Sequence, residues 1–135
     1  KVFTENDHLS KSDDLIVEKW NELKELIIEL DGVEIVPKRQ YISLLFEDKK
    51  NKTIAYIYFQ KKGIRVDFSR GNVYSDGRTS KNFFILDDPK GIAKEDSWTW
   101  KSGAKGNVYK VSIYEDSDLD YIMFLIKQKY KNLRQ

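Results

Sequence analysis

The stretch TIAYIYFQKKGIRVDFSR, residues 53–70, decides the fold class. Apolar and polar side chains alternate on both sides of the triplet KKG at residues 61–63, which predicts two antiparallel strands joined by a tight turn. If Phe59 faces Ile64 across that turn, the apolar side chains of both strands share one face, and a slip of one residue would invert them. The members of that apolar face are Ala55, Ile57, Phe59, Ile64, Val66 and Phe68.

The opposite face of the predicted hairpin is aromatic and cationic. In the same register Tyr58 faces Arg65 and Tyr56 faces Asp67, and Lys110 is expected on a neighbouring strand. Nucleic-acid bases and other planar groups stack on such rings, while cations neutralise phosphates. Tyrosine is also a good strand former and a Tyr–Arg cross-strand pair is favourable by itself, so a purely structural role for this face is the simpler alternative.

Helical periods flank the strands. Residues 13–30 carry one apolar stripe, with Ser12 as the expected N-cap and Gly32 just past the expected end, and residues 117–133 carry another. Besides the hairpin, the stretches that predict strands are residues 33–36, 41–46, 97–101 and 108–114. This order predicts an α+β fold of two layers, in which both helices cover one face of an antiparallel sheet and the other face meets water or a partner.

Length and composition indicate one domain. The chain has 135 residues, no cysteine and no apolar run long enough to span a membrane. The lack of cysteine excludes disulfides, thiolate zinc sites and cysteine nucleophiles, and is compatible with a cytoplasmic location. Residues 1–11 are polar and without period, which predicts a flexible lead-in to a single domain at residues 12–135. Because the chain begins with Lys1 rather than Met, we interpret it as the C-terminal domain of a longer protein whose upstream part is a partner.

The net charge of +2 conceals an asymmetry along the chain. Residues 1–48 carry 6 basic and 12 acidic side chains, whereas residues 49–135 carry 18 basic and 10 acidic ones. A basic surface in the second part would attract a polyanion, although a mixed-charge surface that only favours solubility is the plainer interpretation. The cations expected in or beside a polar loop at residues 71–82, where they could close over a ligand, are Arg70, Arg78 and Lys81.

Catalytic motifs are scarce in the sequence. His8 is the only histidine and falls in the expected lead-in, so a catalytic triad or a histidine metal site is unsupported, and no cofactor motif is found. The alternative that stays open is a metal-dependent nuclease site, in which carboxylates hold Mg²⁺ and a lysine steadies the attacking water or the phosphate. Its candidate residues are Asp31 or Glu34, Glu47 and Lys49. Residues 47–52 have the composition of a charged hairpin turn, so the sequence favours a non-catalytic domain.

Two tryptophans, Trp98 and Trp100, fall on one side of the strand expected at residues 97–101. If they are buried, they belong to the core or its rim. If they are exposed, they mark an interface, and a dimerisation or scaffolding role becomes a third hypothesis.

Three features of the C-terminal half carry a family resemblance. They are the step Asp-Pro-Lys-Gly at residues 88–91, a glycine-rich turn at residues 103–107 and a closing helix of sequence DLDYIMFLIKQKY. With the upstream strands, residues 14–133 resemble a bacterial and archaeal domain of unknown function that is often labelled "predicted transport protein". The resemblance implies a small domain, found alone or at the C-terminus of nuclease- or restriction-associated proteins, and implies no catalytic residue. Many relatives have a histidine before the turn, where this chain has WTWKSGAKGN. Together these observations favour an accessory module that recognises nucleic acid or a protein partner.

Overall fold

The computed structural model describes residues 2–46, 52–81 and 83–134. The strands of this part of the chain form one antiparallel sheet in the order β1-β2-β3-β4-β6-β5. In chain order the elements are α1 (Glu5–Leu9), α2 (Asp14–Ile27), β1 (Val33–Pro37), β2 (Ile42–Phe46), β3 (Thr53–Gln60), β4 (Gly63–Val73), β5 (Ala93–Thr99), β6 (Lys105–Ile113) and α3 (Leu119–Arg134). The predicted α+β class is confirmed. Within these ranges the helices are all too short or too polar to cross a membrane.

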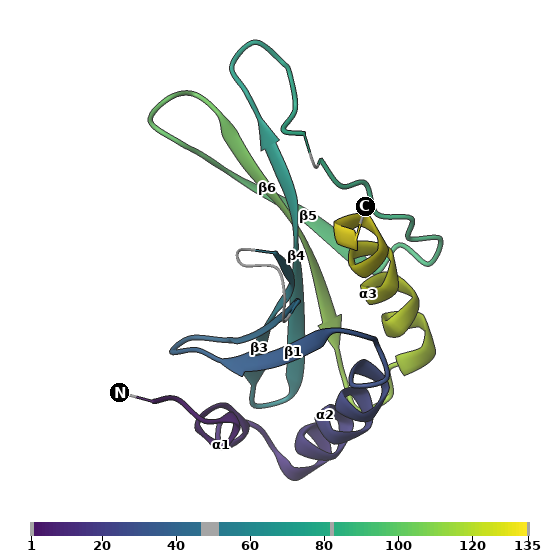
Figure 1. The fold of residues 1–135 in the computed structure, drawn as a ribbon. Helices are drawn as coiled ribbons and strands as arrows, with labels where there is room; N and C mark the ends of the chain where they lie inside the picture. The colour runs from purple at the N-terminus through teal and green to yellow at the C-terminus, as the bar shows by residue number, and fades with distance from the viewer. Residues whose placement is uncertain (1, 47–51, 82, 135) are drawn as a thin grey trace.

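Both long helices, α2 and α3, lie on the same side of the sheet (Figure 1). The apolar stripe of α2 packs on the apolar face of the hairpin, where the ring of Trp20 meets Phe59 edge-on at a centroid distance of 5.2 Å. From α3, Tyr130 stacks on Phe46 of β2, also at 5.2 Å. Burying two amphipathic helices against one face removes most of the large apolar side chains from water, and this is the main driving force of folding. The opposite face of the sheet carries neither α2 nor α3.

The predicted register of the hairpin is confirmed up to a definite point. Phe59 pairs with Ile64, and the pairing of β3 with β4 continues as far as Tyr56 and Asp67. The next pair in the predicted register, Ala55 with Phe68, is absent from the ladder of these described strands, although Ala55 still pairs with β2 and Phe68 still pairs with β6. The two strands of the hairpin therefore diverge beyond Tyr56 and Asp67.

The segment before α2 is folded, so the predicted flexible lead-in at residues 1–11 is wrong for the helical residues 5–9. His8 is buried, with 1% of its surface exposed, and its Nε2 donates a hydrogen bond to the carbonyl of Lys38 at 2.6 Å. The carboxylate of Glu5 accepts a hydrogen bond from the indole Nε1 of Trp20. A helix of five residues is too short to reveal a period in the sequence, and these tertiary contacts hold it in place.

The ends of α2 also differ from the prediction. Asp13 is the N-cap, while the hydroxyl of Ser12 donates to the carbonyl of Gln60 at 2.6 Å and so ties this end of the helix to the hairpin. The helix ends at Ile27, one turn earlier than expected. Gly32, with a φ of 74°, lies in the turn that leads into β1 rather than directly after the helix.

The segment between β4 and β5 runs along the side of the sheet that carries the helices (Figure 1). The amide of Leu86 donates to the hydroxyl of Tyr109 at 3.2 Å, and the side-chain amide of Gln128 exchanges two hydrogen bonds of 2.8 Å with the backbone of Asp87. β4 extends to Val73, three residues into the predicted loop, and β5 begins four residues earlier than residue 97. This segment therefore adds to the helical layer and does not cover the other face of the sheet.

Candidate open-face site

The face of the sheet opposite the helices contains a hollow of about 510 Å³. Side chains alternate between the two faces of a strand, so the polar half of the hairpin pattern points into this hollow. We call this surface the open face. It is lined by Tyr41, Tyr56, Tyr58, Arg65, Asp67, Ser69, Asp96, Trp98, Val108 and Lys110.

Aromatic rings border the open face on two sides. Tyr41, just before β2, lies with its ring 5.1 Å from that of Tyr56 and 5.6 Å from that of Tyr58, measured between centroids. On the far side Trp98 of β5 is 44% exposed and lies against Gly106 of β6, where a Cβ would overlap the indole. The glycine therefore allows the indole to lie close to the sheet, and the rings leave a space that a planar group could enter.

Arg65 is held in a fixed position in the middle of this face. Its guanidinium carbon lies 4.3 Å from the centroid of the Tyr58 ring, and its Nε donates to the carboxylate of Asp67 at 2.9 Å. A second hydrogen bond joins Nη2 to the other carboxylate oxygen at 3.3 Å. Burial raises the pKa of Asp67, and it also raises the pKa of Tyr58, while the guanidinium acts in the opposite direction on both. Stacking and pairing thus orient Arg65 without any ligand.

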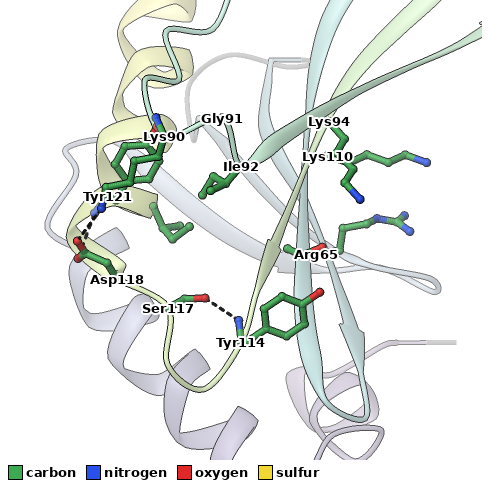
Figure 2. Close-up of a pocket in the computed structure, with 12 residues that line it drawn as sticks. Arg65, Lys90, Gly91, Ile92, Lys94, Lys110, Tyr114, Ser117, Asp118 and Tyr121 are labelled. Atoms are coloured by element: carbon green, nitrogen blue, oxygen red, sulfur yellow. Dashed lines mark hydrogen bonds and ion pairs between the residues drawn. The ribbon is translucent and has the colours of Figure 1, made fainter.

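A second hollow of about 550 Å³ adjoins the open face and shares Arg65 and Lys110 with it. Figure 2 shows Arg65, Lys94 and Lys110 extending to one side, away from Tyr121 and Asp118. Lys110 is paired with a carboxylate of β5 at 2.8 Å, whereas Lys94 forms no ion pair with any residue in the described part of the chain. Because most of its cations are paired, this combined surface has only a weak positive charge, and its chemistry is chiefly aromatic.

A third hollow, of about 300 Å³, shares Tyr56 and Ser69 with the open face. We call it the lysine pocket. It is lined by Lys52, Thr53, Tyr56, Ser69, Gly71, Ser80, Lys81, Lys129 and Leu133. Lys129 of α3 is 4% exposed, its Nζ donates to the carbonyl of Ser69 at 2.7 Å, and burial lowers its pKa to about 8. The sequence pattern does not single out this lysine, because it is polar. Its spacing of three from Ile126 and four from Leu133 was the available indication that it lies on the buried stripe.

The predicted ligand residues divide into two groups. The structure brings together Tyr56, Tyr58, Arg65 and Lys110. Arg70 is not among them, because an irregularity in β4 turns it to the helix side, where it pairs with Glu95 at 3.1 Å and lies 5.2 Å from the ring of Tyr109. Arg78 pairs with Asp76 in the exposed loop, and Lys81 lines the lysine pocket. None of these three cations lines the open face itself, and whether they close over a ligand stays a prediction.

Two of the nuclease candidates, Asp31 and Glu34, do not line this site. Asp31 follows α2, where its carbonyl accepts a hydrogen bond from the Tyr130 hydroxyl, and Glu34 lies exposed on β1. Glu47 and Lys49 fall outside the described residues. In residues 2–46, 52–81 and 83–134, no group of three or more His, Cys, Asp or Glu side chains is placed to hold a metal ion.

The predicted interface residues are both exposed. Trp98 is 44% and Trp100 is 48% exposed, and their rings meet edge-on at a centroid distance of 5.7 Å. Trp98 also belongs to the open face, so this tryptophan contributes to two candidate surfaces.

Comparison with known proteins supplies a relative but no function. No family model matches the chain. Over 98% of its length, the chain is 35% identical to a protein of Haemophilus influenzae strain Rd described as "Uncharacterized protein". The chain spans 38% of the length of that relative.

Proposed function

We propose that this domain is a non-catalytic recognition module that binds single-stranded nucleic acid on its open face. One observation carries the proposal: Tyr41, Tyr56, Tyr58, Trp98 and Arg65 line the same hollow, on the side of the sheet that neither long helix covers. Aromatic side chains on an open sheet bind single strands by stacking on the bases, and every base offers such a surface.

Single strands suit this surface better than duplexes do. The bases of a duplex are stacked on one another, so their planar surfaces are not free to contact the tyrosines. The main cations of the face are ion-paired, Arg65 with Asp67 and Lys110 with Asp96. We therefore expect stacking to supply most of the affinity and the salt dependence to be moderate, since few phosphate charges are neutralised by unpaired cations.

The proposal includes the setting in which the module works. The family resemblance of residues 14–133 supports a C-terminal accessory domain of a larger prokaryotic protein, associated with nuclease or restriction activity and acting in the cytoplasm. In this setting the open face would hold a nucleic-acid strand, and any catalytic activity would belong to another part of the parent protein.

Fluorescence anisotropy with a labelled single-stranded oligonucleotide, as DNA and as RNA, tests the proposal. Stacking of a base on an aromatic side chain contributes about 1–3 kcal/mol, so we expect Tyr58→Ala to weaken binding about tenfold. The matched control is Tyr74→Ala, because Tyr74 is 44% exposed but lies in the loop after β4. Arg65→Ala has its own control in Arg78→Ala, which removes an ion-paired arginine from that loop.

Two results would reject this function. The first is an absence of binding by the wild-type domain at low salt, and the second is a loss of affinity in each control as large as that in its test variant. Mg²⁺-dependent cleavage of the same oligonucleotide, lost in Glu47→Ala, would support the nuclease alternative instead.

Self-association is a second candidate function, favoured by the position of β5. This strand is the outer edge of the sheet, and every residue after its first is exposed. Edge strands with exposed apolar side chains are prone to pair with another chain. Sedimentation velocity of the wild type and Trp100→Ala tests this candidate, because Trp100 does not line the open face. A concentration-dependent dimer in the wild type that is lost in the variant would support it.

A further inference from the structure

The lysine pocket exists because the hairpin strands separate. Pairing between β3 and β4 ends at Tyr56 and Asp67, and beyond this point the two strands border an opening lined by Thr53 of β3 and by Ser69 of β4, which still pairs with β6. The side chain of Lys129 enters this opening from α3 and donates a hydrogen bond of 2.7 Å to the carbonyl of Ser69. This hydrogen bond between a charged side chain and a backbone carbonyl holds the ammonium at the junction of the helical layer and the sheet.

Three lysines line the pocket. Lys52 and Lys81 line it together with Lys129, and no carboxylate lines it among the residues that the structure describes. This contrasts with the open face, where the arginine and Lys110 each have an acidic partner. Like charges gathered without a counter-charge repel one another, and this repulsion is relieved when an anion binds between them.

The buried ammonium has capacity for a ligand. A lysine ammonium carries three donors, and among the described residues the carbonyl of Ser69 is its hydrogen-bond acceptor, with the ring of Phe84 at 4.9 Å as a further contact. Because burial lowers the pKa of Lys129 to about 8, an anion in the pocket would favour its charged form. The hydroxyl of Ser80 also lines the pocket and can donate to an anion.

We propose that the lysine pocket binds a terminal phosphate of the nucleic-acid strand whose bases lie on the open face. This inference rests on the proposed function, and it adds that the module recognises strand ends. Tyr56 and Ser69 line both hollows, so a nucleotide stacked at Tyr56 places its own phosphate at the entrance of the lysine pocket.

The position of Lys129 selects a terminal phosphate over an internal one. Only 4% of the surface of Lys129 is exposed, so a group must have a small cross-section to reach its ammonium. An internal phosphodiester carries a sugar on both sides, whereas a terminal phosphate carries one substituent and presents three oxygens. A terminal phosphate also has a charge of about −1.5 to −2 at neutral pH, which matches a cluster of lysines.

The test compares one oligonucleotide in three forms, with a 5′ phosphate, a 3′ phosphate, or hydroxyls at both ends. We expect one of the phosphorylated forms to bind the wild-type domain about tenfold more tightly than the hydroxyl form, since charge-assisted hydrogen bonds are strong. Lys129→Met should abolish this preference and leave the affinity for the hydroxyl form within about twofold of the wild type, because the open face is unchanged. The control Lys131→Met removes an exposed lysine from the same helix and should keep the preference.

A second variant keeps the test decisive if Lys129→Met does not fold. Lys81 is exposed, so Lys81→Ala leaves the core intact and should still reduce the preference for a terminal phosphate by about threefold. As an independent measurement, titration of inorganic phosphate into the isotope-labelled domain should shift the NMR resonances of Lys129 and Ser69 and not those of Trp98.

The outcomes separate the two proposals. If the hydroxyl and phosphorylated oligonucleotides bind equally well, recognition of strand ends is overturned and the open face remains a binding surface. If both Lys129→Met and Lys81→Ala keep the full preference of the wild type, the phosphate is bound elsewhere and this inference is rejected. If a free nucleoside monophosphate competes as effectively as the phosphorylated strand, the pocket acts without the open face and the inference also fails. If no oligonucleotide binds the wild type, the proposed function itself is wrong.

Discussion

The guanidinium of Arg65 lies against the ring of Tyr58 on the neighbouring strand, 4.3 Å from its centroid. The carboxylate of Asp67, two residues along the same strand, fixes the edge of the guanidinium through hydrogen bonds of 2.9 Å and 3.3 Å. This arrangement serves two opposing purposes. It orients the planar cation for stacking, and it neutralises the charge that would attract a phosphate.

Replacement of Asp67 should therefore strengthen binding of a polyanion. Asp67→Asn keeps the shape and one hydrogen-bond acceptor for Arg65 while it removes a negative charge from the open face. We expect single-stranded oligonucleotides to bind about threefold more tightly at low salt, with a steeper salt dependence, because one more cation is left to neutralise phosphate. Anisotropy titrations at several salt concentrations measure both effects.

The exposed loop provides the control for this prediction. Asp76 forms the same kind of pair with Arg78, two residues away, with Nε 2.7 Å from the carboxylate. Asp76→Asn changes the net charge by the same amount but lies away from the open face. Equal tightening by both variants would show that net charge alone, and not the position of Asp67, determines the result.

The sequence predicts the centre of this site well and its borders poorly. Tyr56, Tyr58 and Arg65 are placed correctly because the binary pattern of the hairpin permits one register that buries all its apolar side chains. The same pattern does not reveal that the strands diverge beyond the pair of Tyr56 and Asp67, because alternation within each strand does not show where the pairing between two strands ends. The alternation of apolar and polar residues therefore does not predict the lysine pocket that results.

Two other parts of the site lack a local pattern altogether. The edge strand β5 is solvated on both sides, so charged residues occupy both faces and no alternation points to Trp98 as an open-face residue. A search for apolar residues at helical spacing passes over Lys129 because it is polar. It nevertheless occupies a position in the buried stripe of α3. Identifying either residue requires the tertiary arrangement, in which Gly106 accommodates the indole and Ser69 accepts from the ammonium.

Gly106 should control the position of Trp98. A Cβ at residue 106 would overlap the indole ring, so Gly106→Ala must displace Trp98 from the sheet. We expect the variant to lose about 1–3 kcal/mol of stability, as is usual for overpacking, and to bind the oligonucleotide more weakly. Urea denaturation and anisotropy measure the two effects.

A double variant tests whether the clash is the cause. Gly106→Ala combined with Trp98→Ala removes the indole that the new methyl group would meet, so the stability lost through the glycine change should be largely recovered. If the two changes are simply additive in stability, the contact between residues 98 and 106 is not what limits substitution of the glycine.

Glu5 should stabilise the domain although it lies outside the predicted fold. Its carboxylate accepts from the buried Nε1 of Trp20 and pairs with Lys24 at 2.7 Å. Glu5→Ala leaves a buried indole N–H without its acceptor, which costs about 1–3 kcal/mol. Chemical denaturation should show this loss, whereas Glu22→Ala on the exposed side of α2 should change stability by less than about 0.5 kcal/mol. Equal stability of Glu5→Ala and the wild type would mean that α1 does not contribute to the cooperative fold.

Lys129 should make stability rise with pH in the alkaline range. Its folded-state pKa of about 8 is below the ordinary value of 10.5, because burial disfavours the charged ammonium. Lys52 and Lys81 line the same pocket, and as cations they supply no negative charge that would stabilise it. Between these two pKa values the unfolded chain binds more protons than the folded one, so the free energy of unfolding increases as pH rises through this window. Below pH 8 the free-energy cost of burying the charged ammonium is fully present.

Compared with Lys129→Met, the wild type should therefore gain about 2 kcal/mol in its free energy of unfolding between pH 7 and pH 10, because each pKa unit corresponds to about 1.4 kcal/mol. Urea denaturation of both proteins at the two pH values measures this difference. The contributions of the titrating groups that both proteins share cancel in it. A constant difference would show that the ammonium of Lys129 is as well stabilised in the folded protein as in water.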